Sequence, residues 1–300
     1  MRNLFTLLLV CALPAIAALA QDTTGTLPPT PTTAPAGRYP RTEFLPKGHL
    51  FEPLRLDPLE AQTSVSVLPS YHMDGERYDG TFVQFTFGLI KPFVRRYRGP
   101  DRASEWSLDV ASYTQFEIFD DAAGVQRRRL VNTDYRVSFI HNRRYGPNNW
   151  RFRLYHLSSH LGDDYLIRNQ INFYTPNAVN YELIDVTYSR YVGAVRLYGG
   201  AGFGLRRPVE RKRLSGQIGI FYRKPQVASA VRLVGGVDVK VWQQTNYRPG
   251  VKAGIGIEVG RTVNNNLVFM LETYSGFRPY SQYEAERTRW FGIGAYFHPI

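Results

Sequence analysis

The feature of this 300-residue chain that most constrains its fold is a regular alternation of apolar and polar residues. From Val131 to Phe139 the odd positions are Val, Thr, Tyr, Val and Phe, and the even positions are Asn, Asp, Arg and Ser. Successive side chains of a β-strand point to opposite faces, so this pattern predicts a strand with one apolar face. The same period recurs in 228–243 and 290–297. The chain is therefore predicted to be all-β.

The N-terminus predicts export. Residues 1–20 combine an early positive charge at Arg2, a long apolar stretch and a final Ala-Leu-Ala, which is the pattern of a signal peptide. The single cysteine, Cys11, lies within this segment, so no disulfide is expected in the mature chain. Lipoprotein cleavage before Cys11 is the alternative, but Val10 stands where a small residue is expected.

Two further segments precede the predicted strands. Residues 21–40 are rich in Thr, Pro and Ala and predict a disordered linker. Residues 41–61 carry large apolar side chains interrupted by prolines, which predicts an irregular segment packed against another part of the protein. The remainder, 62–300, contains the alternating segments.

These alternating segments predict an antiparallel transmembrane β-barrel in the outer membrane of a Gram-negative-type bacterium. The chain has 20 tyrosines and 18 phenylalanines, and beyond the signal peptide it has no apolar run of the roughly 18 residues that a membrane helix needs. Thirteen segments qualify as strands, and because single-chain bacterial barrels have even numbers, about 12 strands are expected. A soluble β-sandwich is the alternative. Faces with Arg, Asp and Lys must point into the lumen, which is expected to be filled by ion pairs rather than open.

The charge favours lipids as partners. The formal net charge is +12, and arginines cluster between the predicted strands. Such clusters suit anionic lipid headgroups or lipid phosphates at the membrane rim, although solvated loop charge and interfacial snorkelling explain them equally well. Nucleic acid is not expected as a partner, because the chain is predicted to be exported and has no nucleic-acid motif.

The segment Tyr155–Asp163 carries the candidate chemistry. His156 and Ser158 are two residues apart in a predicted strand, so they share a face, and that face continues the apolar side of the strand. A serine hydroxyl becomes a nucleophile when a histidine accepts its proton. We therefore predict Ser158 as nucleophile and His156 as base. His160 either belongs to this site or is a polar interfacial residue.

A third group is expected from the next predicted strand, 165–175. Asn169 is a polar residue in an apolar row there, and it would need a hydrogen-bond partner in lipid, which His156 could provide. Glu182 and Asp185, further along the chain, are candidate ligands for calcium, as are Asp163 and Asp164, which directly follow the motif. The alternative for Asp163 and Asp164 is an ordinary Gly-Asp-Asp turn.

The motif resembles two outer-membrane families, phospholipase A and lipid A deacylase, which carry a His-x-Ser on a barrel strand. The first resemblance implies a 12-stranded barrel with a lipid-facing Ser/His/Asn site, here Ser158, His156 and Asn169, and calcium near it. The chain departs from the phospholipase pattern after the serine, where Ser159 and His160 stand. The chain is also similar to a bacterial family of exported barrel-like proteins without assigned function, in 50–54, 155–163 and 292–296. That resemblance implies the fold alone.

Two functions follow from these observations. The first is an outer-membrane acyl hydrolase acting on phospholipid or lipid A esters. The second is a non-enzymatic barrel, structural or a narrow channel. Other catalytic motifs, such as Gly-x-Ser-x-Gly or His-Glu-x-x-His, are missing from the sequence. A lipid-facing His156/Ser158 pair would favour the first function, and a lumen-facing pair the second.

Overall fold

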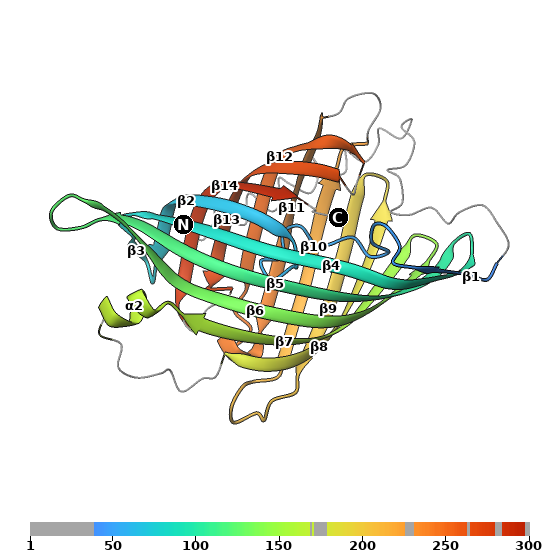
Figure 1. The fold of residues 1–300 in the computed structure, drawn as a ribbon, viewed down its shortest axis with the longest axis horizontal. Helices are drawn as coiled ribbons and strands as arrows, with labels where there is room; N and C mark the ends of the chain where they lie inside the picture. The colour runs from blue at the N-terminus through green and yellow to red at the C-terminus, as the bar shows by residue number, and fades with distance from the viewer. Residues whose placement is uncertain are drawn as a thin grey trace.

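The computed structural model describes residues 39–168, 170, 179–225, 231–262, 265–279 and 284–297. In this part of the chain, 12 antiparallel strands close into a barrel (Figure 1). Each strand from β4 to β14 pairs with the next one along the chain, and β2 closes the ring by pairing with both β14 and β4. The wall strands are β2 (Thr63–Met73), β4 (Thr81–Gly99), β5 (Arg102–Asp120), β6 (Gln126–Tyr145), β7 (Asn148–Leu161), β8 (Asn180–Val192), β9 (Val195–Gly204), β10 (Leu214–Arg223), β11 (Val231–Trp242), β12 (Gly250–Thr262), β13 (Asn265–Phe277) and β14 (Arg287–Phe297). The predicted fold class is confirmed.

Four short elements complete the described chain. Two are strands, β1 (Arg41–Phe44) and β3 (Glu76–Arg77), and two are helical turns, α2 (Asp163–Arg168) and η1 (Gln243–Thr245). β1 lies within the segment 41–61 that the sequence predicted to be irregular. In the described residues, no helix is both long enough and apolar enough to span a membrane.

The wall has an apolar outer face and a charged inner face. Buried inner residues of β6 and β7 include Asp134, Arg136, Arg151 and Arg153, as the alternation predicted. Turning these charges toward lipid would cost about 2–4 kcal/mol for each Arg or Lys at the membrane midplane. The exposed outer side chains are mostly apolar and include Phe87, Leu108, Val110, Val137, Phe139, Phe152, Leu154, Ile184, Ile255, Ile257, Phe269, Leu271, Phe291 and Ile293.

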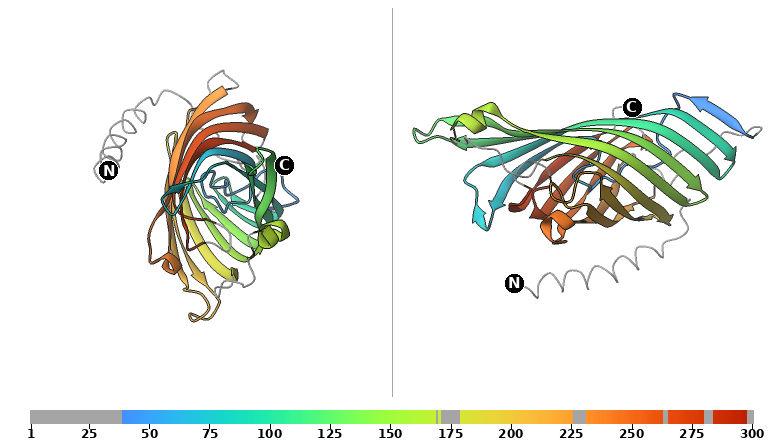
Figure 2. Two further views of the ribbon diagram at one scale, coloured as in Figure 1. Left: turned by 90° about the vertical axis from the view of Figure 1, so that its left-hand side faces the viewer. Right: turned by 90° about the horizontal axis from the view of Figure 1, so that it is seen from below.

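Residues 46–62, here called the plug, enter the lumen between β1 and β2 (Figure 2). Nearly all of its residues from 48 onward are buried, and Leu54 and Asp57 are fully inaccessible. This agrees with the prediction that the segment packs against another part of the protein and that the lumen is filled. A filled lumen argues against an open channel.

Ion pairs and hydrogen bonds from the wall hold the plug. Glu52 pairs with Arg223, Asp57 with Lys240 at 3.0 Å, and Glu60 with Arg151 at 2.8 Å. The wall also satisfies the irregular backbone of the plug: the Arg196 guanidinium donates to the carbonyls of Glu52 and Pro53, and the Tyr113 hydroxyl donates to the carbonyl of Leu59. Buried polar groups without such partners would cost free energy.

The same contacts set the charge of the plug carboxylates. Burial alone would raise the pKa of Glu52, but Arg223 and Arg196 outweigh burial and hold the pKa below its ordinary value. The pKa of Asp57 is lowered in the same way by Lys240 and Arg153, and that of Glu60 by Arg151 and Arg153. The plug therefore carries ionised carboxylates against a cationic wall at neutral pH.

Candidate functional site

The candidate site lies on the outer face of β7. His156, Ser158 and His160 alternate with the buried Leu157 and Ser159, so the three polar side chains point outward. They continue the lipid-facing row formed by Trp150, Phe152 and Leu154. Outward placement of His156 and Ser158, with Arg151 and Arg153 inside, agrees with the orientation expected from the sequence.

Ser158 is hydrogen-bonded to His160. The Oγ of Ser158 lies 2.8 Å from Nε2 of His160, so the hydroxyl donates to this nitrogen when the nitrogen is unprotonated. The His160 ring packs edge-on against Tyr135 of β6, with ring centroids 5.7 Å apart. The structure thus brings together a hydroxyl and an imidazole in the geometry of a nucleophile and its base.

His156, which the sequence predicted as the base, is held by a different partner. Its Nδ1 lies 2.9 Å from Oε1 of Glu182, which faces it across the β7–β8 pairing. The other carboxylate oxygen of Glu182 pairs with Nε of Arg206 at 3.2 Å. All three side chains are 36–41% exposed, so they form a polar group at the surface of the barrel. A carboxylate at Nδ1 fixes the ring of a histidine and leaves its Nε2 free.

Asn169 lies outside the described residues, so its predicted role stays a prediction. The prediction of a strand over 165–175 is wrong for its first residues, because Asp163–Arg168 is the helix α2. The next strand along the chain that pairs with β7 is β8, and this pairing places Glu182 opposite His156. Sequence reasoning noted Glu182 only as a possible cation ligand and missed its contact with His156.

The predicted calcium ligands are not gathered into a site. Asp163 is exposed at the first residue of α2, and Asp164 follows it in the helix. Glu182 is engaged by His156 and Arg206, and Asp185 is on the opposite face of β8, paired with Arg153. Among the side chains that the structure describes, no group of three or more His, Cys, Asp or Glu is arranged to hold a metal ion. The described side chains of Asp163, Glu182 and Asp185 therefore do not form a calcium site, and the role of Asp164 stays a prediction.

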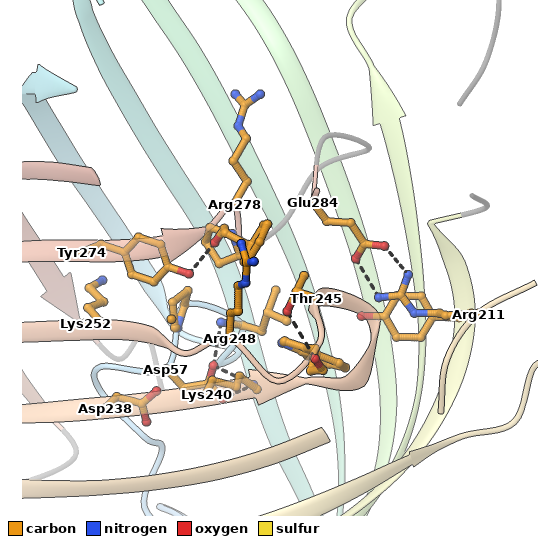
Figure 3. A pocket seen from close by; sticks show the side chains of 17 residues that line it. Asp57, Arg211, Asp238, Lys240, Thr245, Arg248, Lys252, Tyr274, Arg278 and Glu284 are labelled. Atoms are coloured by element: carbon orange, nitrogen blue, oxygen red, sulfur yellow. Dashed lines mark hydrogen bonds and ion pairs between the residues drawn. The ribbon is translucent and has the colours of Figure 1, made fainter. Parts of the chain in front are cut away.

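A cavity of about 40 Å³ lies inside the barrel, between the plug and the loops at the end of the barrel that holds Ser158 (Figure 3). Its charged residues are largely paired with one another: Arg211 donates to both carboxylate oxygens of Glu284 at 2.6 and 2.7 Å, and Lys240 donates to Asp57. Asp238 accepts hydrogen bonds from Tyr198 and Gln217. The residues that line the cavity include no serine–histidine pair, so this cavity is a polar space inside the lumen and is separate from the candidate site on the outer face.

The fold and the outward polar site define an outer-membrane type of β-barrel. The chain belongs to the family described as "Protein of unknown function (DUF1207)", whose model matches residues 30–299. Two solved structures are similar to it. They are the outer membrane phospholipase A of Escherichia coli (11% identity, TM-score 0.52, 80% of this chain and 98% of that chain) and the calcium-bound phospholipase dimer of Salmonella typhi (11% identity, TM-score 0.52, 94% and 96%). At this identity the likeness shows the fold alone. A comparison with curated proteins finds no match.

Proposed function

We propose that this protein is an outer-membrane hydrolase of lipid acyl esters, with Ser158 as nucleophile. The observation that carries the proposal is the hydrogen bond between Ser158 Oγ and His160 Nε2 on the outer face of the wall. An enzyme that acts on phospholipid or lipid A within the bilayer needs its nucleophile on this face. The similarity in fold to the phospholipases supports the same reaction class.

The reaction follows from the contacts of these side chains. His160 accepts the hydroxyl proton as Ser158 Oγ attacks the ester carbonyl, and the protonated His160 then gives that proton to the departing alcohol. The acyl group stays on Ser158 until water, deprotonated by His160, attacks the new ester. The bond between the acyl carbon and Ser158 Oγ then breaks, the fatty acid leaves, and His160 returns the proton to Oγ. His156 precedes Ser158 by two residues on the same face of β7, and its ring is held by Glu182. Ser158 therefore has an imidazole two residues away on each side.

The lengths of the connections support a position of the site in the outer leaflet. At the end of the barrel opposite to the site, the turns 100–101, 146–147 and 193–194 are tight. At the end that holds Ser158, the connections 162–179 and 205–213 are long. Bacterial barrels have short periplasmic turns and longer extracellular loops. This comparison supports an orientation of Ser158 toward the extracellular side.

The test is ester hydrolysis by the purified protein in detergent, on phospholipid and on lipid A, with and without calcium. Ser158→Ala should lower kcat by at least about 10³-fold and abolish labelling by a sulfonyl fluoride, since removal of a serine nucleophile costs this much or more. His160→Ala should have a similar effect, and His156→Ala a smaller one. The matched control is Ser104→Ala. Ser104 is an outward-facing serine of β5 at the end of the barrel away from Ser158, and this variant should keep full activity. The proposal fails if the wild-type protein neither cleaves these lipids nor takes the label at Ser158.

A reversed order of the two histidine variants would restore the original prediction of His156 as base. In that case the Ser158 side chain would turn toward His156, with Glu182 as the third member of the site. Measuring both variants with the same substrate distinguishes the two arrangements.

A further inference from the structure

The loop 205–213, between β9 and β10, borders the candidate site. The backbone N–H of Leu205 donates to the carbonyl of Glu182 at 2.9 Å, so the loop begins beside the residue that holds His156. The loop sequence is Leu-Arg-Arg-Pro-Val-Glu-Arg-Lys-Arg, which has five cationic residues and one acidic residue. It is thus the most basic connection at this end of the barrel.

An ion pair and a cation–π contact hold this loop on the two faces of β8. On the outer face Arg206 pairs with Glu182. On the inner face Arg211 pairs with Glu284 (Figure 3). Its guanidinium also lies over the ring of Tyr181, 3.9 Å from the ring centroid. Because Tyr181 and Glu182 are neighbours in the chain, the loop straddles the start of β8. A loop held at two points presents its other side chains at fixed positions.

Three of its cations remain available. Arg207 and Lys212 are exposed, and Arg213 lies over the ring of the lipid-facing Phe203, with its guanidinium 5.3 Å from the ring centroid. In the described part of the chain, none of the three is paired with a carboxylate; Lys212 donates to an Asn246 side chain and Arg213 to the carbonyl of Arg206. They are free to neutralise the charge of a ligand.

The apolar residues of the loop place it at a membrane surface. Val209 is 90% exposed and Leu205 is 46% exposed, although both belong to a strongly charged segment. An exposed apolar side chain flanked by Lys and Arg is typical of segments that bind the headgroup region of a bilayer. The ligand that these cations meet is therefore a lipid headgroup.

We propose that loop 205–213 binds the phosphomonoester group of an anionic lipid and so holds the acyl esters of that lipid beside Ser158. A phosphomonoester carries about −1.5 to −2 charges at neutral pH and three strong acceptor oxygens, so it matches three unpaired cations better than a phosphodiester with a single charge does. The statement that this lipid is a substrate rests on the hydrolase function proposed above. The statement that the loop binds the lipid is independent of that function.

The experiment measures lipid binding in a Ser158→Ala background, so that the lipid stays intact. Fluorescent phosphatidic acid and lipid A carry phosphomonoesters, phosphatidylglycerol carries a phosphodiester, and phosphatidylcholine is zwitterionic. The test variant is Arg207→Gln/Lys212→Gln/Arg213→Gln. The matched control, Arg102→Gln/Arg143→Gln/Arg190→Gln, removes three exposed arginines at the other end of the barrel.

The parent protein should bind phosphatidic acid and lipid A more tightly than phosphatidylglycerol, and phosphatidylcholine least. One cation near a membrane surface changes the affinity about fivefold, so the test variant should lose on the order of 100-fold, and the control less than about threefold. Raising the salt concentration should weaken the parent and leave the test variant nearly unchanged.

Two results would overturn the proposal. One is equal affinity of the parent for phosphatidylglycerol and the phosphomonoester lipids, and the other is unchanged affinity in the test variant. Because the binding measurement needs no turnover, its result stays valid even if the protein proves not to hydrolyse lipids. Phosphatidic acid and lipid A as separate arms show whether a phospholipid or lipid A is the preferred source of the phosphomonoester.

Discussion

The ion pair between Glu60 of the plug and Arg151 of β7 provides a sharp test of how the lumen is held. Both Oε atoms of Glu60 accept from Nη1 of Arg151, at 2.8 and 2.9 Å, and the side chains are 0% and 2% exposed. Glu60→Gln leaves the arginine charge buried without its carboxylate. Breaking a buried pair in this way costs about 3–5 kcal/mol, so the free energy of unfolding should fall by that amount.

Removing the second charge should reverse most of this loss. In Glu60→Gln/Arg151→Met no buried charge is left unpaired, and replacing a buried ion pair by groups of similar volume is often close to neutral. The double variant should therefore unfold within about 1 kcal/mol of the wild type, so adding Arg151→Met to Glu60→Gln should restore at least about 2 kcal/mol. Exposed Glu76→Gln is the control and should change little.

The assay is equilibrium unfolding in detergent, followed by tryptophan fluorescence and by the electrophoretic shift between folded and unfolded barrel. Conductance across a planar bilayer reports separately whether the plug leaves the lumen. A Glu60→Gln protein as stable as the wild type, or a double variant as unstable as the single one, would refute the reasoning.

Two further predictions concern the lumen. Because the pKa values of Glu52, Asp57 and Glu60 are lowered in the folded state, their contribution to stability is complete above the ordinary carboxyl pKa near 4 and is lost as pH falls through the lowered values. Unfolding free energy should be flat from about pH 7 to 5 and fall below about pH 4, and amide substitution at the three positions should flatten this fall. Gly256→Ala should destabilise the barrel by about 1–3 kcal/mol, because a Cβ there meets the carbonyl oxygen of Phe269, whereas Gly199→Ala makes only ordinary contacts and should be tolerated in the same assay.

The wall could be predicted from the sequence because lipid imposes a strict rule on it. The charged positions of 131–139 and 228–243 must face inward, so the alternation fixes the orientation of each strand. The rule fails locally at Val131, which was placed on the apolar face but is buried. A register shift between Gln115 and Phe116 of β5 leaves Val131 as an extra residue in β6, and such a bulge has no signature in the alternation.

The site was predictable only in part. The outward position of Ser158 follows from its own strand, but its partners depend on side-chain rotamers and on pairing between strands. Ser158 has a histidine two residues away on each side, and the spacing alone does not decide between them. The apolar row around 165–175 suits a short strand or a helix equally well. The strand that faces β7 begins only after the long connection 162–179, so Glu182 could not be located opposite His156 from the sequence.

The path of the chain from β1 through the plug to β2, where the barrel closes, has a consequence for assembly. β1 and β2 both pair with β4, at residues 94–97 and 82–86 respectively, and the plug is the segment between them. The plug is therefore a loop tethered at both ends to the wall, and it cannot be threaded in as a free tail. β2 also makes the pairing with β14, which joins the two ends of the sequence and carries the largest loop-closure entropy of the wall. The plug must accordingly lie inside the curved sheet before the pairing of β2 with β14 closes the barrel.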